Sequence, residues 1–311
     1  HAFKISISKK TKQAVTFNIG SINYSVFNSS VSFNNSNFSF SNTYLNKDKT
    51  IELSEIKFDE IKLEGLSLFH LIFKDELVAK KFLLSEPLLG FRENQNPISF
   101  TKKPKEIIGS IKEKHDFLGD LTIIVDEIEI THGKVDILSI LLGEEHDGNV
   151  EFSLLLKKFN TSNNTRHEDR VLFAKNHFVK LSNFNYTLPN GDKIGFDSIV
   201  LESKTNTLVV SNIKAEIVSK SIHANIDSVF ADIGEIYVNG IDFEALEKNI
   251  HDIVIDSITI SDVFLQLTNK DEPEPSKISA DTSNRNNDFL GAINKLNLGS
   301  LLLRNINLLA S

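Results

Sequence analysis

The chain has 311 residues, a formal net charge of −8 and no cysteine. Its scattered Lys and Arg residues argue against a nucleic-acid binder and against an anionic membrane surface, and the absence of thiols excludes disulfides, thiolate metal sites and cysteine nucleophiles. Apolar residues make up 40% and charged residues 24% of the chain, which is the profile of a folded protein. The 23 Phe residues, against 4 Tyr and no Trp, favour strands.

No stretch approaches the roughly 20 apolar residues that span a bilayer, and no basic and then apolar signal segment opens the chain. The sequence starts at His1, contains no Met and ends at Ser311 within an apolar pattern. We therefore expect a fragment of a longer polypeptide, with any membrane anchor outside it.

From residue 51 onwards, apolar and polar residues alternate, which is typical of strands with one buried and one wet face. The alternating pairs are, in chain order, Ile56 and Phe58, Ile61 and Leu63, Phe82 and Leu84, Ile128 and Ile130, and Ile258 and Ile260. Short helices are expected at 66–73 and 243–249. Pro189-Asn190-Gly191 predicts a tight hairpin, because Asn-Gly tolerates positive φ. We therefore expect mostly antiparallel neighbours.

An internal repeat organises these elements. Residues 60–68 match 235–243 at every apolar position, with the glycines Gly65 and Gly240 offset by 240 minus 65, which is 175. Residues 76–88 match 252–264 at an offset of 176, and Asp-Phe-Leu-Gly recurs at 116–119 and 288–291. Ile51, Leu53, Ile56 and Phe58 are echoed more weakly by Ile194, Phe196, Ile199 and Leu201.

The predicted fold class is mainly β. We expect an elongated, curved antiparallel sheet with a few short helices, built from tandem repeats. The predicted divisions are the end of a preceding repeat at 1–55, repeat one at 56–230 and the first part of repeat two at 231–311. The other possibility is a closed sandwich or barrel whose apolar faces meet.

The cassette Ile61-x-Leu63-x-Gly65-Leu66-x-Leu68, a short helix, then Phe82-x-Leu84-Ser85-Glu86-Pro87-Leu88 recurs in repeat two. There it reads Ile236-x-Val238-x-Gly240-Ile241-x-Phe243, a short helix, then Ile258-x-Ile260-Ser261-Asp262-Val263-Phe264, without the proline. This order of elements resembles the AsmA-like family, with its TamB and chorein-type relatives. The resemblance implies a long sheet curled into a taco-shaped groove, in a periplasmic body between two membranes.

The resemblance also implies that the groove binds or conducts lipid acyl chains, or supports outer-membrane biogenesis. Phospholipid is the expected ligand and an outer-membrane protein a possible partner, with no nucleic acid and no cofactor. The expected groove lining consists of alternating apolar residues. They are Ile56, Phe58, Ile61, Leu63, Phe82, Leu84, Ile128, Ile130, Phe196, Ile199, Leu201, Ile236, Val238, Ile258 and Ile260.

Enzyme chemistry has no candidate residues. The nine His residues lack H-x-H and H-E-x-x-H spacing, and no G-x-S-x-G elbow, P-loop or G-x-G-x-x-G occurs. Glu144-Glu145-His146-Asp147-Gly148 has the composition of a cation site, but it is better interpreted as an exposed loop before a strand. His132 beside Gly133 is expected in a turn that ends a strand. Asp126 and Glu127 are expected to point to opposite faces.

A second hypothesis comes from another class of protein. The chain would then be a structural or accessory β-sandwich subunit of an outer-membrane or cell-surface complex, whose sheet edge recruits a partner strand.

Overall fold

The computed structural model describes residues 15–40, 51–93, 122–141, 144–162, 173–187, 191–218, 226–243, 245, 252–269 and 295–310. Nearly all of these residues are in strands, so the prediction of a mainly β protein is confirmed. The chain divides into two compact units, one formed by 1–98 and 114–181 and the other by 99–113 and 182–311.

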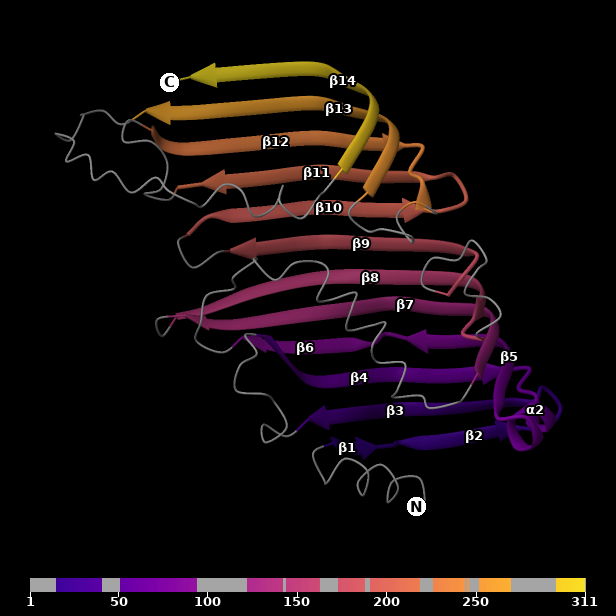
Figure 1. The fold of residues 1–311 in the computed structure, drawn as a ribbon. Helices are drawn as coiled ribbons and strands as arrows, with labels where there is room; N and C mark the ends of the chain where they lie inside the picture. Colours follow the sequence, from indigo (N-terminus) through magenta and orange to yellow (C-terminus); the bar gives the residue numbers. More distant parts are fainter. Residues whose placement is uncertain are drawn as a thin grey trace. The chain divides into compact units, whose positions relative to one another are not determined.

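Unit 1 contains the first eight strands and one helix (Figure 1). Its elements are β1 (Val15–Asn18), β2 (Ser21–Ser25), β3 (Ser30–Phe40), β4 (Ile51–Glu64), α2 (Leu68–Phe73), β5 (Glu76–Ser85), β6 (Leu88–Glu93), β7 (Thr122–Leu141) and β8 (Glu144–Asn160). The strands are ordered β1-β3-β4-β5-β7-β8, while β2 pairs with β3 and β6 pairs with both β4 and β7.

Unit 2 continues the strand pattern. Its strands are β10 (Lys193–Glu202), β11 (Thr207–Ile217), β12 (Ile226–Asn239), β13 (Asp252–Asn269) and β14 (Lys295–Ala310), in that order, preceded by the second half of β9 (Asn176–Thr187). Phe184 of β9 stacks on Phe196 of β10 at 4.8 Å between ring centroids. The turn expected at Pro189 and Asn190 lies outside the described residues.

The strand pairing is mixed rather than purely antiparallel. β5 and β6 both pair with β7 in parallel, and β13 pairs with β14 in parallel. Parallel neighbours need a long connection that returns along the strand, and in both places such a length of chain intervenes, 94–121 and 270–294. Alternation alone does not distinguish strand direction, so the sequence did not predict these pairs.

The connections from β4 to β5 and from β12 to β13 begin with the same local geometry. Gly65 and Gly240 have φ of 63° and 72°, a region where only glycine is free of steric cost. After Gly65, the N–H of Ser67 donates to the carbonyl of Val78 at 2.9 Å. After Gly240, the N–H of Asp242 donates to the carbonyl of Val254 at 3.0 Å. Repeat-related positions thus have matching backbone bonds.

The predicted helix at 66–73 is confirmed as α2, which begins two residues later. Ser67 caps it, because its hydroxyl oxygen accepts from the N–H of His70 at 3.5 Å. Leu68, Phe69, Ile72 and Phe73 are exposed. Of the helix expected at 243–249, Phe243 and Ala245 are helical, and the remaining positions lie outside the described residues.

Left-handed residues interrupt several strands at neighbouring positions. In β13 and β14 they are Asp262 and Asn305, with φ of 57° and 51°, and the Asn305 side-chain amide donates to the Asp262 carboxylate at 2.9 Å. Glu86 and His132 occupy the equivalent places beside β6 and within β7, with φ of 50° and 51°. His132 therefore lies inside a strand, and the expectation that it ends one is wrong.

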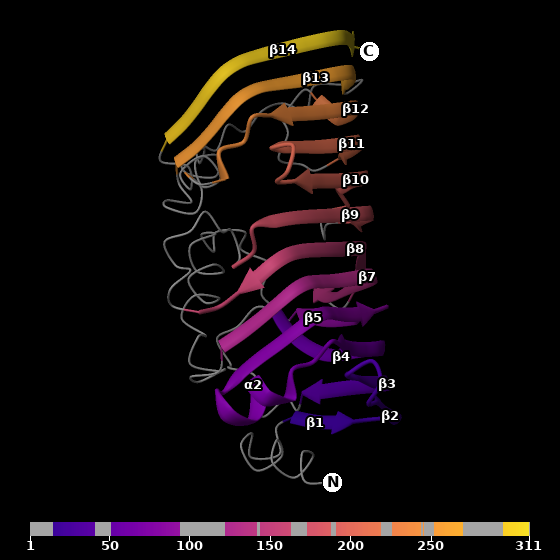
Figure 2. The same cartoon turned by 90° about the vertical axis from the view of Figure 1, so that its right-hand side faces the viewer.

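These residues change the phase of the apolar pattern. In β13 the apolar residues Ile258 and Ile260 have even numbers, and after Asp262 they continue at Val263 and Leu265. An irregular residue bends a strand and rotates the side chains that follow it, so the change of phase keeps the apolar residues on one side. Figure 2 shows β13 and β14 bending together.

Candidate functional site

Apolar side chains of unit 1 form two ladders across β4, β5, β7 and β8. One ladder runs through Leu63, Phe82, Ile128 and Leu156, each directly opposite the next in register. The other runs through Ile61, Leu84, Ile130 and Leu154. Residues two apart on a strand share a face, so these eight residues lie on one face, which we call apolar face 1.

Unit 2 has the same arrangement over five strands. Its ladders are Leu201, Leu208, Val238, Ile258 and Leu301, and Ile199, Val210, Ile236, Ile260 and Leu303. We call these ten residues apolar face 2. Cross-strand apolar pairs of this kind stabilise a sheet by roughly 0.2–1 kcal/mol each.

Most of the residues on both faces are half-buried. Leu156 and Val238 are buried, with 6% of each exposed, whereas Leu301 and Leu303 at the β14 edge are 55% and 51% exposed. The other residues of each ladder are half-buried, because each lies beside its neighbours on the adjacent strands. Such a surface is apolar, continuous within each unit and partly open to water.

Twelve of the fifteen predicted lining residues belong to these two faces. Ile61, Leu63, Phe82, Leu84, Ile128 and Ile130 are in apolar face 1, and Ile199, Leu201, Ile236, Val238, Ile258 and Ile260 are in apolar face 2. The other three lie on the far side of the strand irregularities. Ile56 pairs with Leu89, Phe58 is 3% exposed, and Phe196 stacks on Phe184.

The sequence reasoning missed six ladder residues. They are Leu154, Leu156, Leu208, Val210, Leu301 and Leu303. They occur in continuous apolar runs, such as Leu154-Leu155-Leu156 and Leu301-Leu302-Leu303, where alternation gives no signal. Only the strand register identifies which members of each run share the face.

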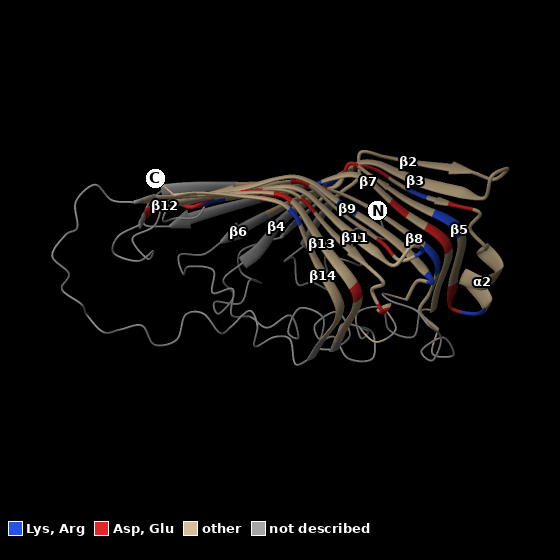
Figure 3. Cartoon of the chain, turned by 90° about the horizontal axis from the view of Figure 1, so that it is seen from above, with Lys and Arg blue, Asp and Glu red and all other residues tan. Residues whose placement is uncertain are grey.

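The opposite face of unit 1 is charged. Glu64, Lys81, Glu127 and Lys157 are opposite one another across β4, β5, β7 and β8. Figure 3 shows acidic and basic positions close together on β5 and β8. The Lys81 ammonium lies 2.9 Å from Glu127 and 2.5 Å from Glu129, and these two bonds raise the pKa of Lys81. This face is therefore ionised and wet.

Asp126 and Glu127 have separate partners, as their alternation predicts. Asp126 accepts from Lys158 at 2.9 Å, while Glu127 bonds Lys81 on the neighbouring strand β5. The two carboxylates are therefore paired with different lysines.

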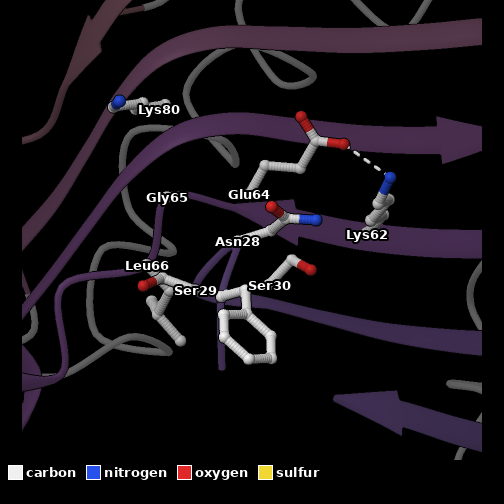
Figure 4. Close-up of a pocket in the computed structure, with 9 residues that line it drawn as sticks. Asn28, Ser29, Ser30, Lys62, Glu64, Gly65, Leu66 and Lys80 are labelled. Atoms are coloured by element: carbon white, nitrogen blue, oxygen red, sulfur yellow. Dashed lines mark ion pairs between the residues drawn. The ribbon is translucent and has the colours of Figure 1, made fainter. Parts of the chain in front are cut away.

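A hollow in unit 1 is polar. It has a volume of about 590 Å³ and lies beside the Gly65 turn, where it is lined by Phe27, Asn28, Ser29, Ser30, Lys62, Glu64, Gly65, Leu66 and Lys80 (Figure 4). Lys62 and Glu64 form an ion pair of 2.6 Å in it, and this bond lowers the pKa of the Glu64 carboxyl. Ser30 is buried in this lining, whereas the charged side chains of Lys62 and Glu64 are partly exposed to water.

A hollow in unit 2, of about 280 Å³, lies over β9 to β12 and is lined in part by Tyr186, Phe196 and Phe230. Asn212 and Asp197 border it, with the Asn212 amide donating to the Asp197 carboxylate at 2.7 Å. The hollow is therefore lined by aromatic rings together with charged and amide side chains such as Lys193, Lys214 and Glu216.

His177 on β9 is buried, with 5% of the residue exposed, and this burial lowers its pKa. It is therefore neutral at physiological pH, and a buried neutral imidazole at the start of a strand is in keeping with a structural role.

The cation-site reading of Glu144 to Gly148 gains no support. These residues are the first five of β8, so the expected loop is wrong. Among the described residues, no group of three His, Asp or Glu side chains is placed to hold a metal ion. No helix within the described residues has the length and apolar content needed to cross a bilayer.

Comparison with known proteins identifies no relative. No protein-family model matches the chain, and no curated protein matches it at a significant level. The resemblance to the AsmA-like family therefore depends on the cassette alone, and the function is argued below from the two apolar faces.

Proposed function

We propose that the chain is a non-enzymatic lipid-binding protein of the AsmA-like type, which holds or conducts phospholipid acyl chains on its apolar faces. The observation that carries this proposal is the pair of ladders in each unit, apolar on one face while the opposite face of unit 1 is charged. The cellular setting that we propose is the periplasm, with a role in lipid movement or outer-membrane biogenesis in the cell envelope.

The apolar face of a sheet must pack on protein or on another apolar partner. Burying a methylene contributes roughly 0.8 kcal/mol, so a chain of about sixteen carbons on such a face gains on the order of 10 kcal/mol before entropy costs. A ladder of Leu, Ile and Val offers no directional bonds, which suits acyl chains of varied length.

The test uses adjacent residues of β13 on opposite faces. Ile260 lies on apolar face 2 between Ile236 and Leu303, whereas Thr259 lies opposite Tyr237 and Leu302 on the other face. The variants Ile260→Asp and Thr259→Asp add the same charge one residue apart. Mass spectrometry of lipid extracted from each purified protein gives the phospholipid content, and circular dichroism reports the fold.

We expect the Ile260→Asp protein to stay folded and to lose most of its phospholipid, while Thr259→Asp keeps the wild-type amount. Unfolding of Ile260→Asp would mean that the face is sealed by protein, because an unpaired buried carboxylate costs several kcal/mol. Wild-type protein without phospholipid would likewise reject the proposal.

The exposed edge of β14 favours the second candidate, a structural or accessory β-sandwich subunit of an outer-membrane or cell-surface complex. In that case the ladders meet a second protein layer, and the same two variants separate the candidates.

A further inference from the structure

β14 is the most exposed strand of unit 2. Among the described strands it pairs with β13 alone, and every residue from 299 to 310 is exposed. Six of these are large apolar side chains. They are Leu301, Leu302, Leu303, Ile306, Leu308 and Leu309, with exposed fractions from 43% to 74%. Edges of this kind are normally shortened, charged or covered, and β14 carries only Lys295 and Arg304 as charges.

β14 occupies the position in unit 2 that β7 occupies in unit 1. Thr122 of β7 is opposite Glu76, and Lys295 of β14 is opposite Asp252. Further along, Lys134 is opposite Leu88 and Asn307 is opposite Phe264. Both comparisons give an offset of 173 for the second strand and 176 for its parallel partner.

The shared register passes through the same backbone irregularity. Glu86 and His132 are left-handed in unit 1, and their counterparts at the same offsets, Asp262 and Asn305, are left-handed in unit 2. The β5–β7 and β13–β14 pairs agree in direction, in register and in the position of the irregularity. The edge of β14 that points away from β13 is therefore equivalent to the edge of β7 that points away from β5.

In unit 1 that outward edge is covered. β8 pairs with it antiparallel, with Leu156 opposite Ile128, Leu154 opposite Ile130 and Phe152 opposite Gly133. Ile128 and Ile130 are half-buried as a result, whereas their counterparts Leu301 and Leu303 are 55% and 51% exposed. The difference between the two units at this place is the covering strand.

We propose that the outer edge of β14 binds an antiparallel strand of the β8 type, in the β7–β8 register. The bound strand extends the β13–β14 pairing by one strand and presents apolar residues opposite Leu301, Leu303 and Ile306, where β8 presents Leu156, Leu154 and Phe152. Main-chain bonds supply affinity and the apolar positions supply selectivity, as in other cases of strand addition.

The alternation of backbone bonds identifies which N–H groups of β14 receive the partner. In β7, the carbonyl of Thr131 accepts from the N–H of Glu86, so the backbone groups of Thr131 and Glu129 face β5 and those of Ile130 face β8. In β8, the carbonyl of Lys157 accepts from the N–H of Lys175 on the far side, so the backbone groups of Leu154 and Leu156 face β7. The counterpart of Ile130 is Leu303, whose N–H points outward, away from β13.

The experiment uses the full chain and a fluorescent peptide with the sequence of residues 150–160, Val-Glu-Phe-Ser-Leu-Leu-Leu-Lys-Lys-Phe-Asn. Binding is followed by fluorescence anisotropy, and amide hydrogen exchange locates it. We expect the peptide to bind, to slow exchange across residues 298–308, and to bind more tightly than a scrambled peptide of equal composition.

Two matched pairs of variants test the geometry. Leu303→Pro removes the outward N–H, a place where an edge strand tolerates proline, while Leu303→Val keeps it. We expect peptide affinity to fall about tenfold or more in Leu303→Pro and to stay within about twofold in Leu303→Val. Protein stability is checked by the urea midpoint of each variant.

A second pair leaves the protein unchanged. N-methylation of the peptide at Leu154, which faces β7 in unit 1, blocks the bond to Leu303, whereas N-methylation at Leu155 does not. Only the Leu154 modification should weaken binding. Equal binding by the scrambled peptide, equal effects of the two methyl groups, or protection outside β14 would each overturn the proposal.

Discussion

Strands β4 to β7 of unit 1 and β12 to β14 of unit 2 follow the same path, and they differ in two places. The first difference is a proline. In unit 1, Pro87 separates β5 from β6, whereas in unit 2 the counterpart Val263 pairs with Ile306 and β13 runs unbroken from Asp252 to Asn269. Proline lacks the N–H that a ladder requires, although its carbonyl still accepts from Lys134 at 2.7 Å.

The second difference is the cover. β7 lies between β5 and β8, while β14 pairs with β13 alone among the described strands. The leucines of β14 are exposed. One cassette therefore gives the same strand path twice, and neighbouring strands then decide whether its last strand is half-buried or exposed. Stability should therefore be more sensitive to substitution in β7 than in β14.

The largest expected effect is at Val125, which is 2% exposed and lies opposite Ala79 and Phe159. Val125→Asp buries an unpaired carboxylate and should destabilise unit 1 by about 3 kcal/mol or more. Its counterpart in β14 is Leu298, where Asp should cost clearly less. Urea unfolding with hydrogen exchange on both variants measures the difference, and equal losses would contradict the comparison.

Truncation of a ladder residue should have the next largest effect. Ile128→Ala removes a half-buried side chain between Phe82 and Leu156 and should cost about 2–3 kcal/mol. Leu301→Ala, at the equivalent position, should cost less than about 1 kcal/mol because Leu301 is 55% exposed. A ratio near one in urea unfolding would show that β14 is covered.

The left-handed glycines Gly65 and Gly240 should tolerate alanine poorly. Gly240→Ala should cost about 1–2 kcal/mol, because φ is 72° and the added carbon would meet Asp256. Gly65→Ala should cost somewhat less, because the added carbon meets the long, flexible side chain of Lys80. Gly240→Asn serves as control, since asparagine tolerates left-handed backbone better than alanine. Thermal unfolding ranks the three.

The positions of the Lys81 cluster carry no charges in unit 2, where Ser257, Ser300 and Leu302 occupy the places of Lys81, Glu127 and Glu129. Lys81→Ser should destabilise unit 1 by up to about 1 kcal/mol at low salt and less at high salt. The raised pKa of Lys81 means that its contribution is complete below pH 10.5, its ordinary value, and is lost as pH rises through the folded pKa.

Lys193→Ser is the control for that variant. Lys193 forms an exposed pair of 3.1 Å with Glu216 in unit 2, and both side chains are largely in water. Its loss should change the urea midpoint less than the loss of Lys81, and a larger change would contradict the role given to the Lys81 cluster.

The smallest expected effect is a pH dependence from His177. Burial lowers its folded pKa below the ordinary 6.5, so the unfolded chain binds more protons and stability falls as pH drops below about 6.5. His177→Gln should make stability less dependent on pH between 7.5 and 5, as measured by urea unfolding.

Much of the fold could be predicted from the sequence. Alternation located β4, β5 and β13, and Gly65 and Gly240 marked the ends of equivalent strands. The same alternation predicted twelve residues of the two apolar faces. It failed in leucine runs, in the direction of β7 and β14, and at His132, because alternation reports which side of a strand is apolar and carries no information on neighbours.

The sequence by itself determined the local facts: where strands run, which side chains alternate, where glycine or proline is needed, and that one cassette occurs twice. These depend on steric and hydrophobic properties of residues close together in the chain. The tertiary structure alone decided that β5 and β13 take parallel partners, that Ile128 and Ile130 are half-buried, and that Leu301 and Leu303 are exposed. Pairing and burial depend on residues distant in sequence, so similar strands acquire different environments from their neighbours.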